Sequence, residues 1–135
     1  MSAFYVASRA SIPARSAMWR DLRDGYDYHI TSTWIDEAGE GETACNTELW
    51  QRIENEIRIS DGLILYAEPD DFPLKGALVE VGMALGMGKR VMIVAPKVHL
   101  EDKSLRPLGS WAMHPLVTFH QTVPQAVASF ERIAA

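Results

Sequence analysis

The sequence predicts an α/β fold in which a five-stranded parallel sheet is doubly wound, with helices covering both of its faces. Five short apolar or β-branched segments alternate with segments of helical periodicity, and this alternation is typical of a parallel sheet with crossover helices. No repeat, low-complexity tract or flexible linker interrupts the 135 residues. We therefore expect one domain over residues 1–135.

The first strand is predicted at residues 3–8 (AFYVAS), an apolar run of the kind that is buried in a parallel sheet. A helix follows at residues 13–24, because Pro13 suits a first helical turn and Gly25 suits a helix end. Residues 28–34 (YHITSTW) are rich in β-branched and aromatic side chains, which favours a second strand.

An acidic loop at residues 36–43, with Gly39 and Gly41, leads to a helix from about Cys45 to Ile59. Four apolar side chains recur at helical spacing and mark the face of this helix toward the core: Leu49, Trp50, Ile53 and Ile57. The Asp-Gly pair at residues 61–62 breaks the helix, and residues 63–67 (LILYA) form a strongly apolar third strand.

The second half of the chain continues this alternation. Glycines end its first helix, and Pro124 stands at the start of its last one. The predicted elements are a loop at residues 68–73, a helix at 76–88, a strand at 90–95, a loop at 96–115, a strand at 116–119 and a helix at 125–133. The whole pattern is Rossmann-like or flavodoxin-like.

The composition narrows the class of partner. A net charge of −5 and a pI near 5.3 argue against a protein that binds nucleic-acid polymers, since such proteins need a basic surface for the phosphates. No stretch approaches the ~18 apolar residues of a membrane span. A single cysteine, Cys45, fits a reducing compartment. We expect a cytoplasmic protein whose partners are small molecules or other protein chains.

Several familiar site motifs do not fit. Gly82, Gly86 and Gly88 precede a strand instead of following one, and Arg90 stands where a phosphate loop needs Ser or Thr. The four histidines form no i, i+4 pair on a predicted helix, so no metal site is predicted. No Gly-x-Ser-x-Gly elbow is present. We expect neither a metal nor a cofactor.

In a doubly wound sheet, ligands bind outside the carboxyl ends of the strands. This rule selects the loops at residues 7–13, 34–43 and 68–76. The helix after the third loop reads GALVEVGMALGMG, and Glu80 is its only charged residue. A helix that is apolar all round is normally buried, here between the sheet and another subunit.

A carboxylate in such a helix needs a cleft or a partner, because burying it unpaired is costly. The positive end of the helix dipole favours the ionised form of Glu80, which a nucleophile requires. Periodicity alone equally allows a surface glutamate placed near a helix N-terminus.

The segment at residues 76–91, GALVEVGMALGMGKRV, resembles the core motif of the nucleoside 2-deoxyribosyltransferase family, which includes the 2′-deoxynucleoside 5′-monophosphate N-glycosidases. Three more segments resemble this family in the expected order: FYVAS at residues 4–8, STW at 32–34 and ISDGLILY at 59–66. The resemblance covers most of the chain. It implies an enzyme that breaks N-glycosidic bonds of nucleosides or nucleotides.

By this resemblance, Glu80 matches the glutamate that attacks C1′ of the sugar, and Tyr5 matches the tyrosine that hydrogen-bonds and positions it. Arg9 lies in the loop that cradles a 5′-phosphate in some members, and its planar fork suits phosphate; a solvated loop residue is the alternative. The implied substrate-binding residues are Ala7, Ser8, Arg9, Trp34, Asp70, Lys75, Gly76, Trp111 and His114.

Trp34 would line the base pocket, while Trp111 and His114 resemble a late loop that can reach a neighbouring subunit's site. The family's usual assembly is a dimer or larger, and the face of the helix with Met83 and Met87 would suit burial in such an assembly.

Two positions depart from the family. Ile53 stands where the family carries an aspartate that contacts the sugar or the departing base, and Leu74 replaces a polar residue before the nucleophile. Glu54 and Glu56 have other helical directions than Ile53, and Asp70, Asp71 or Lys75 could take the place of Leu74.

Two hypotheses follow. The first is an N-glycosidase or deoxyribosyltransferase for nucleosides or their 5′-monophosphates. The second is a nucleotide-binding protein of the same fold that performs no reaction. Glu80 and Tyr5 favour the enzyme, whereas Ile53 and Leu74 favour the binding protein. Arg9 favours hydrolysis of a monophosphate.

Overall fold

The computed structural model describes residues 2–37 and 46–134. Its centre is a five-stranded, all-parallel sheet in the order β2-β1-β3-β4-β5. The strands are β1 (Ala3–Ala7), β2 (His29–Ile30), β3 (Gly62–Tyr66), β4 (Arg90–Val94) and β5 (Val117–His120). The direction of winding reverses between β1 and β3, which confirms the predicted doubly wound class. Proteins of this class bind ligands where the two strands at the reversal end.

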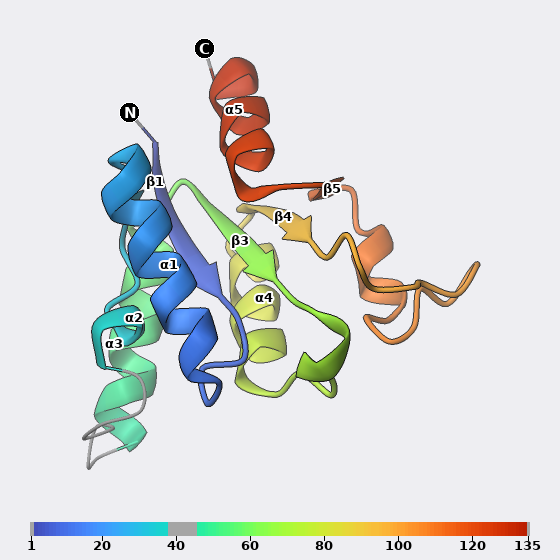
Figure 1. Ribbon diagram of the computed structural model, residues 1–135, viewed down its shortest axis with the longest axis horizontal. Helices are drawn as coiled ribbons and strands as arrows, with labels where there is room; N and C mark the ends of the chain where they lie inside the picture. Colours follow the sequence, from blue (N-terminus) through green and yellow to red (C-terminus); the bar gives the residue numbers. More distant parts are fainter. Residues whose placement is uncertain (1, 38–45, 135) are drawn as a thin grey trace.

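Helices pack on both faces of the sheet. Consecutive side chains of β1 alternate between the faces: Phe4 packs edge-on against Phe130 of α5 (Val123–Ala134), and Tyr5 bonds to Glu80 of α4 (Gly76–Gly86). Figure 1 shows α1 (Pro13–Tyr26) in front of the sheet, with α3 (Asn46–Arg58) and α4 behind it. Both ends of the chain lie at the edge opposite to the strand ends.

The core is formed by the strands and the inner faces of these helices. Every residue of β1 is buried, as are the first four of β3. Trp19 of α1 is fully buried and donates its indole N–H to Ser8 at 2.9 Å. No helix within residues 2–37 and 46–134 is long and apolar enough to cross a membrane.

The second strand is shorter than predicted. Only His29 and Ile30 pair with β1, and Trp34 begins a short helix, α2 (Trp34–Glu37). The reason is that a side chain replaces the strand ladder: the Ser32 hydroxyl accepts the Val6 N–H at 2.7 Å. The remainder of the predicted loop, with Gly39 and Gly41, and the predicted helix start at Cys45 lie outside the described residues.

The first helix is longer than predicted, because it continues through Gly25 to Tyr26. The turn that ends it is made by Asp27, whose backbone is left-handed (φ 59°) and whose N–H bonds to the Arg23 carbonyl. Two predicted loops also contain short helices of the 3-10 type, η1 (Pro69–Asp71) and η2 (Ser110–Met113).

The left-handed backbone of Asp27 provides a test of stability. Replacing Asp27 with glycine removes a strain that costs a non-glycine residue about 1 kcal/mol. We expect Asp27→Gly to raise the free energy of unfolding by about 0.5–1 kcal/mol, measured by urea denaturation. The same substitution at Asp24, inside the helix, should lower it by a similar amount. If both variants are destabilised, Asp27 does not end the helix in this way.

Candidate active site

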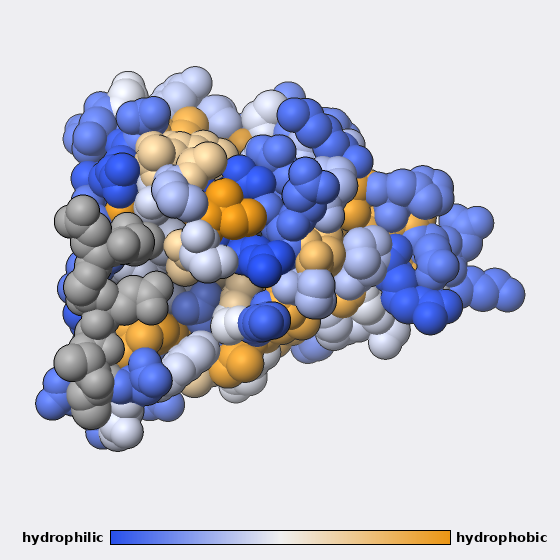
Figure 2. Space-filling model, turned by 60° about the horizontal axis from the view of Figure 1, so that its bottom comes forward, coloured by the Kyte–Doolittle hydropathy of each residue, from blue (hydrophilic) through white to orange (hydrophobic). Residues whose placement is uncertain are grey.

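A cavity of about 380 Å³ opens at the carboxyl ends of β1 and β3. The loop after β1 contributes the first side of the cavity, α2 and α3 the second, and the start of α4 the third. Figure 2 looks onto this end of the molecule, where apolar residues form separate patches within a hydrophilic surface. The lining residues are Ser8, Arg9, Ala10, Ser11, Trp34, Leu49, Trp50, Ile53, Lys75, Gly76, Ala77 and Glu80.

Tyr5 and Glu80 form a buried hydrogen-bonded pair at this cavity. The Tyr5 hydroxyl donates to Glu80 Oε2 at 2.6 Å. Tyr5 is fully buried in the middle of β1, whereas 8% of Glu80 is exposed, on the second turn of α4 where it lines the cavity. The strand thus delivers the donor from beneath, and the helix presents the acceptor to the cavity. The sequence motif had placed both residues in one site, and the structure brings them together.

Burial dominates the protonation of Glu80. Loss of water raises its pKa to about 8; the Tyr5 hydrogen bond lowers it and the charge of Glu56 raises it. The pKa of Tyr5 is itself raised well above its usual value, chiefly by burial and then by the Glu80 charge, so Tyr5 remains a donor. The helix N-terminus was expected to favour the ionised form of Glu80, but loss of water on burial is the largest cause and leaves the pKa raised.

One wall of the cavity is apolar. Trp34 of α2 and three residues of α3 form it: Leu49, Trp50 and Ile53. The Trp34 indole N–H donates to the Val6 carbonyl at 2.8 Å, so this polar atom is already used within the protein. A side chain added at Gly76 would meet the Trp50 ring at 3.7 Å, so the indole lies against the start of α4.

Sequence reasoning missed Leu49 and Trp50 of this wall, while the resemblance had already placed Ile53 at a site position. Sequence reasoning assigned all three residues to the core because they recur at helical spacing. That assignment is correct for Ile53, which is buried, but Leu49 and Trp50 are only half-buried. Periodicity identifies the inward face of a helix and does not distinguish packed volume from a cavity.

No described carboxylate replaces the aspartate missing at Ile53, whereas Lys75, next to the buried Leu74, does line the cavity. Ile53 lines the cavity, whereas Glu56 does not. The Glu56 carboxylate accepts hydrogen bonds from the Thr33 hydroxyl, at 2.8 Å, and from the Thr33 backbone N–H. Glu54 pairs with Arg58 on the surface. Leu74 is buried in the core. Among the described residues, Glu80 is therefore the one carboxyl group that lines the cavity.

The opposite side of the cavity carries two cationic residues, Arg9 and Lys75. One guanidinium nitrogen of Arg9 donates to the backbone carbonyl of Asp71 at 3.2 Å. Ser8 also lines the cavity, but its hydroxyl donates to the Tyr66 carbonyl and accepts the indole N–H of Trp19. Its hydroxyl is thus engaged inside the protein, and its role toward a substrate stays a prediction.

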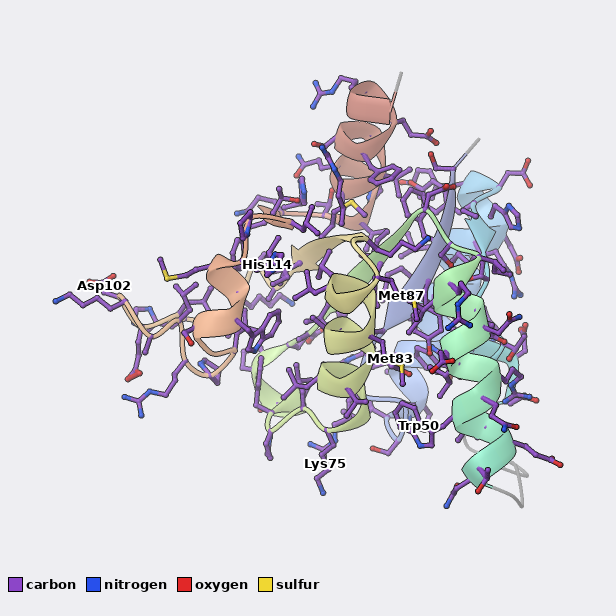
Figure 3. The ribbon with its side chains drawn as sticks, turned by 180° about the vertical axis from the view of Figure 1, so that it is seen from behind. Trp50, Lys75, Met83, Met87, Asp102 and His114 are labelled. Carbon is purple, nitrogen blue, oxygen red and sulfur yellow. The ribbon has the colours of Figure 1, made fainter. Side chains whose placement is uncertain are left out.

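Four predicted site residues lie apart from the cavity lining. Ala7 is buried in β1, and Asp70 is exposed on η1. The Trp111 indole donates to the Leu108 carbonyl, and the His114 ring accepts the Leu116 N–H. Figure 3 shows His114 apart from Trp50 and Lys75, and neither Trp111 nor His114 lines the cavity of its own chain.

The apolar residues of α4 differ in how far they are buried. Met83 and Met87 are partly buried and lie between α4 and α3 in Figure 3. Val79 is 51% exposed, and Gly82 and Gly86 are exposed as well. Burial of the face with Met83 and Met87 in an assembly stays a prediction.

Comparison with known proteins confirms the fold that the sequence resemblance implied. No protein-family model and no curated protein matches the chain. The structure is similar to the 2-deoxyribosyltransferase of the psychrotolerant bacterium Bacillus psychrosaccharolyticus, with a TM-score of 0.69 and 14% identity over 93% of this chain and 90% of that one. It is also similar to the Clostridium botulinum CMP N-glycosidase BcmB, with a TM-score of 0.54 and 12% identity over 96% and 98%.

The raised pKa of Glu80 predicts how stability depends on pH. Its pKa is about 8 in the folded chain and near the ordinary value of 4.5 when unfolded, so the folded state binds the proton more tightly. The stability that this difference provides is present below pH ~4.5 and is lost as the pH rises to ~8.

We therefore expect the free energy of unfolding of Glu80→Gln, relative to that of the natural chain, to be higher at pH 9 than at pH 5. The increase should be on the order of a few kcal/mol. The amide oxygen of the introduced glutamine can still accept the Tyr5 hydrogen bond, so the variant isolates the ionisation. Denaturant titration at both pH values measures the difference. An equal effect of the substitution at pH 5 and pH 9 would show that burial does not raise the pKa of Glu80.

Proposed function

We propose that this protein cleaves the N-glycosidic bond of a nucleoside, a deoxynucleoside or its 5′-monophosphate, with Glu80 as nucleophile. The observation that carries the proposal is the 2.6 Å hydrogen bond between Tyr5 and the cavity-lining Glu80. The cavity, about 380 Å³, falls within the range that binds small molecules. Two enzymes of the same fold, a 2-deoxyribosyltransferase and a CMP N-glycosidase, agree with this reaction type.

The reaction would proceed in two displacements. An ionised Glu80 oxygen bonds to C1′ of the sugar while the C1′–N bond breaks, and the base departs with that electron pair and takes up a proton. Water, or the nitrogen of an acceptor base, then attacks C1′ and releases Glu80, with net retention of configuration. Tyr5 holds the carboxylate in the attacking position by its hydrogen bond.

The polarity of the cavity suggests how a nucleotide would lie in it. The base would rest against the apolar wall of Trp34, Leu49, Trp50 and Ile53, and the sugar would lie over Glu80. Arg9 and Lys75 would bind the 5′-phosphate, since guanidinium and ammonium groups both bind phosphate oxygens. We therefore favour hydrolysis of a monophosphate.

A nucleotide-binding protein without catalysis is the second candidate. Two observations favour it: the cavity presents Ile53 in place of a polar group, and burial raises the pKa of Glu80 to about 8, which leaves it largely protonated at neutral pH. A protonated carboxyl group is a poor nucleophile. The binding protein would use the same cavity and the same cationic residues.

We further propose a cytoplasmic protein that assembles as a homodimer or larger. In such an assembly, Trp111 and His114 would approach the cavity of a neighbouring copy, since neither lines the cavity of its own chain.

Turnover by purified protein tests the proposed function. The protein is incubated with a panel of deoxynucleosides and their 5′-monophosphates, with and without an acceptor base, and base release or exchange is followed by chromatography. We expect release of a base by the natural chain, and a loss of about a thousandfold or more in Glu80→Gln, since an amide cannot form the glycosyl intermediate.

Glu54→Gln is the matched control, because Glu54 lies on the surface of α3 and pairs with Arg58. It should retain activity. Activity that survives intact in Glu80→Gln would exclude Glu80 as nucleophile. No turnover across the panel, together with tight binding of one nucleotide, would establish the binding protein instead.

The pH profile tests the state of the nucleophile. Because Glu80 must be ionised to attack and its pKa is about 8, kcat/KM should rise about tenfold per pH unit below pH ~8 and level off above it. Tyr5→Phe removes the hydrogen bond that lowers the pKa of Glu80, so its residual activity should level off at a higher pH. A profile that is flat from pH 6 to pH 9 would contradict this assignment.

A further inference from the structure

Asp71 is a fully buried carboxylate beside the cavity, outside the lining itself. It ends η1 in the loop between β3 and α4, and its carboxylate receives a two-pronged ion pair from Arg15 of α1. The Arg15 Nε donates to one oxygen at 2.8 Å, and a terminal nitrogen of Arg15 donates to the other at 2.7 Å. This planar fork is the strongest form of a protein ion pair.

The same residue also fixes its own loop. One Asp71 carboxylate oxygen accepts the backbone N–H of Glu68 at 2.9 Å, and the Asp71 N–H bonds back to the Glu68 carbonyl. Burial alone would raise the pKa of Asp71, but its hydrogen bonds with Arg15 and Glu68 lower the pKa below the usual value, so the carboxylate is ionised.

Arg9 binds the backbone of Asp71, not its carboxylate. The Asp71 carbonyl accepts a hydrogen bond from a terminal nitrogen of Arg9 at 3.2 Å. The carboxylate is occupied by Arg15, and no ion pair of Arg9 is formed with another described residue. Arg9 is thus oriented by a neutral acceptor, and its charge acts on the Asp71 carboxylate only as the last of the causes that lower its pKa. Within the described residues Arg9 forms no salt bridge, and it lines the cavity, where its charge can meet an anion.

Arg15 itself is committed inside the protein. Besides Asp71, it lies 3.6 Å from a Glu68 oxygen and 5.8 Å from the centre of the Tyr66 ring, and only 9% of it is exposed. The two arginines therefore have separate roles, although both bind Asp71. Arg15 neutralises the buried carboxylate, and Arg9 keeps its charge for the cavity.

We infer that Arg15 and Asp71 are positioning residues that hold Arg9 at the cavity and so make the site prefer a ligand with a phosphate at the sugar 5′ end over the uncharged nucleoside. The inference rests on the proposed function for the identity of the ligand as a nucleotide. It does not require turnover, because positioning a cation for phosphate acts on binding.

The experiment measures binding in the Glu80→Gln background, where no reaction consumes the ligand. Dissociation constants are determined by calorimetry for four 2′-deoxynucleoside 5′-monophosphates and the four matching nucleosides. Phosphate preference is the nucleoside constant divided by the monophosphate constant. We expect Arg9→Ala to lower this preference by about 10- to 100-fold, the usual value of a charge-assisted hydrogen bond.

Arg15→Lys keeps the positive charge but cannot form both prongs of the fork. It should lower the phosphate preference about three- to tenfold with little change in nucleoside affinity. In a protein that already carries Arg9→Ala, Arg15→Lys should have no further effect on the preference, because Arg15 acts through Arg9. Asp71→Asn should behave as Arg15→Lys does.

Arg23→Lys is the matched control, since Arg23 forms the same kind of fork with Asp36 on the surface. It should leave the preference unchanged, and thermal melting of each variant verifies that it is folded. A lower melting temperature of Arg15→Lys with an unchanged preference would overturn the inference and leave a purely structural ion pair. The inference would also be overturned if Arg15→Lys lowered the phosphate preference equally in the protein with Arg9 and in the protein with Arg9→Ala.

The inference and the proposed function fail in distinguishable ways. If the natural chain releases no base but the preference falls as expected in Arg15→Lys, the glycosidase proposal fails and the positioning of Arg9 stands. If base is released but monophosphates bind no tighter than nucleosides, the enzyme proposal stands and the positioning of Arg9 for phosphate is overturned.

Discussion

A carboxyl group withdrawn from water must find its hydrogen-bond donor inside the protein, and at Glu80 this requirement connects the sheet to the site. The donor is the hydroxyl of Tyr5, which reaches the carboxyl group only because Tyr5 occupies the face of β1 turned toward α4. A shift of one residue in the register of β1 against β3 would turn Tyr5 toward α5. The bond therefore depends on the strand order, the register and the packing of α4 together.

The loops that surround this pair are held by a second buried polar group. Asp71 joins α1 to the loop before α4 through Arg15, and the same loop leads to Lys75 and Gly76 at the cavity. The result is a cavity with two unlike ends: an apolar wall from α2 and α3, and cationic side chains beside η1. Glu80 lines the same cavity, and the proposed placement of a nucleotide puts the base on the apolar wall, the sugar over Glu80 and the phosphate on the cationic side chains.

The departure at Ile53 has a structural consequence for the chemistry. Glu56 is a buried carboxylate on the same helix, but each of its two oxygens accepts a hydrogen bond from Thr33. Because Ile53 is apolar, the cavity receives no second carboxylate from α3 within the described residues. The proposed reaction therefore relies on a single carboxyl group, and burial opposes the ionisation of that group. The reaction rate should depend more steeply on pH than in a site where two carboxyl groups share the work.

The sequence alone determined the fold class and most of the strands and helices, because apolar periodicity is local. The pairing of Tyr5 with Glu80 was implied by the resemblance of two separate segments to a known family. The sequence did not determine the end of α1 at Asp27 or the early end of β2, where a backbone turn and the Ser32 hydroxyl decide the path. Tertiary structure also decided that Leu49 and Trp50 face a cavity, that Arg9 is oriented by Asp71, and that Glu80 holds its proton up to pH ~8. Each of these depends on how much water remains around a side chain and on partners distant in the chain, and neither quantity is carried by the local pattern of residues.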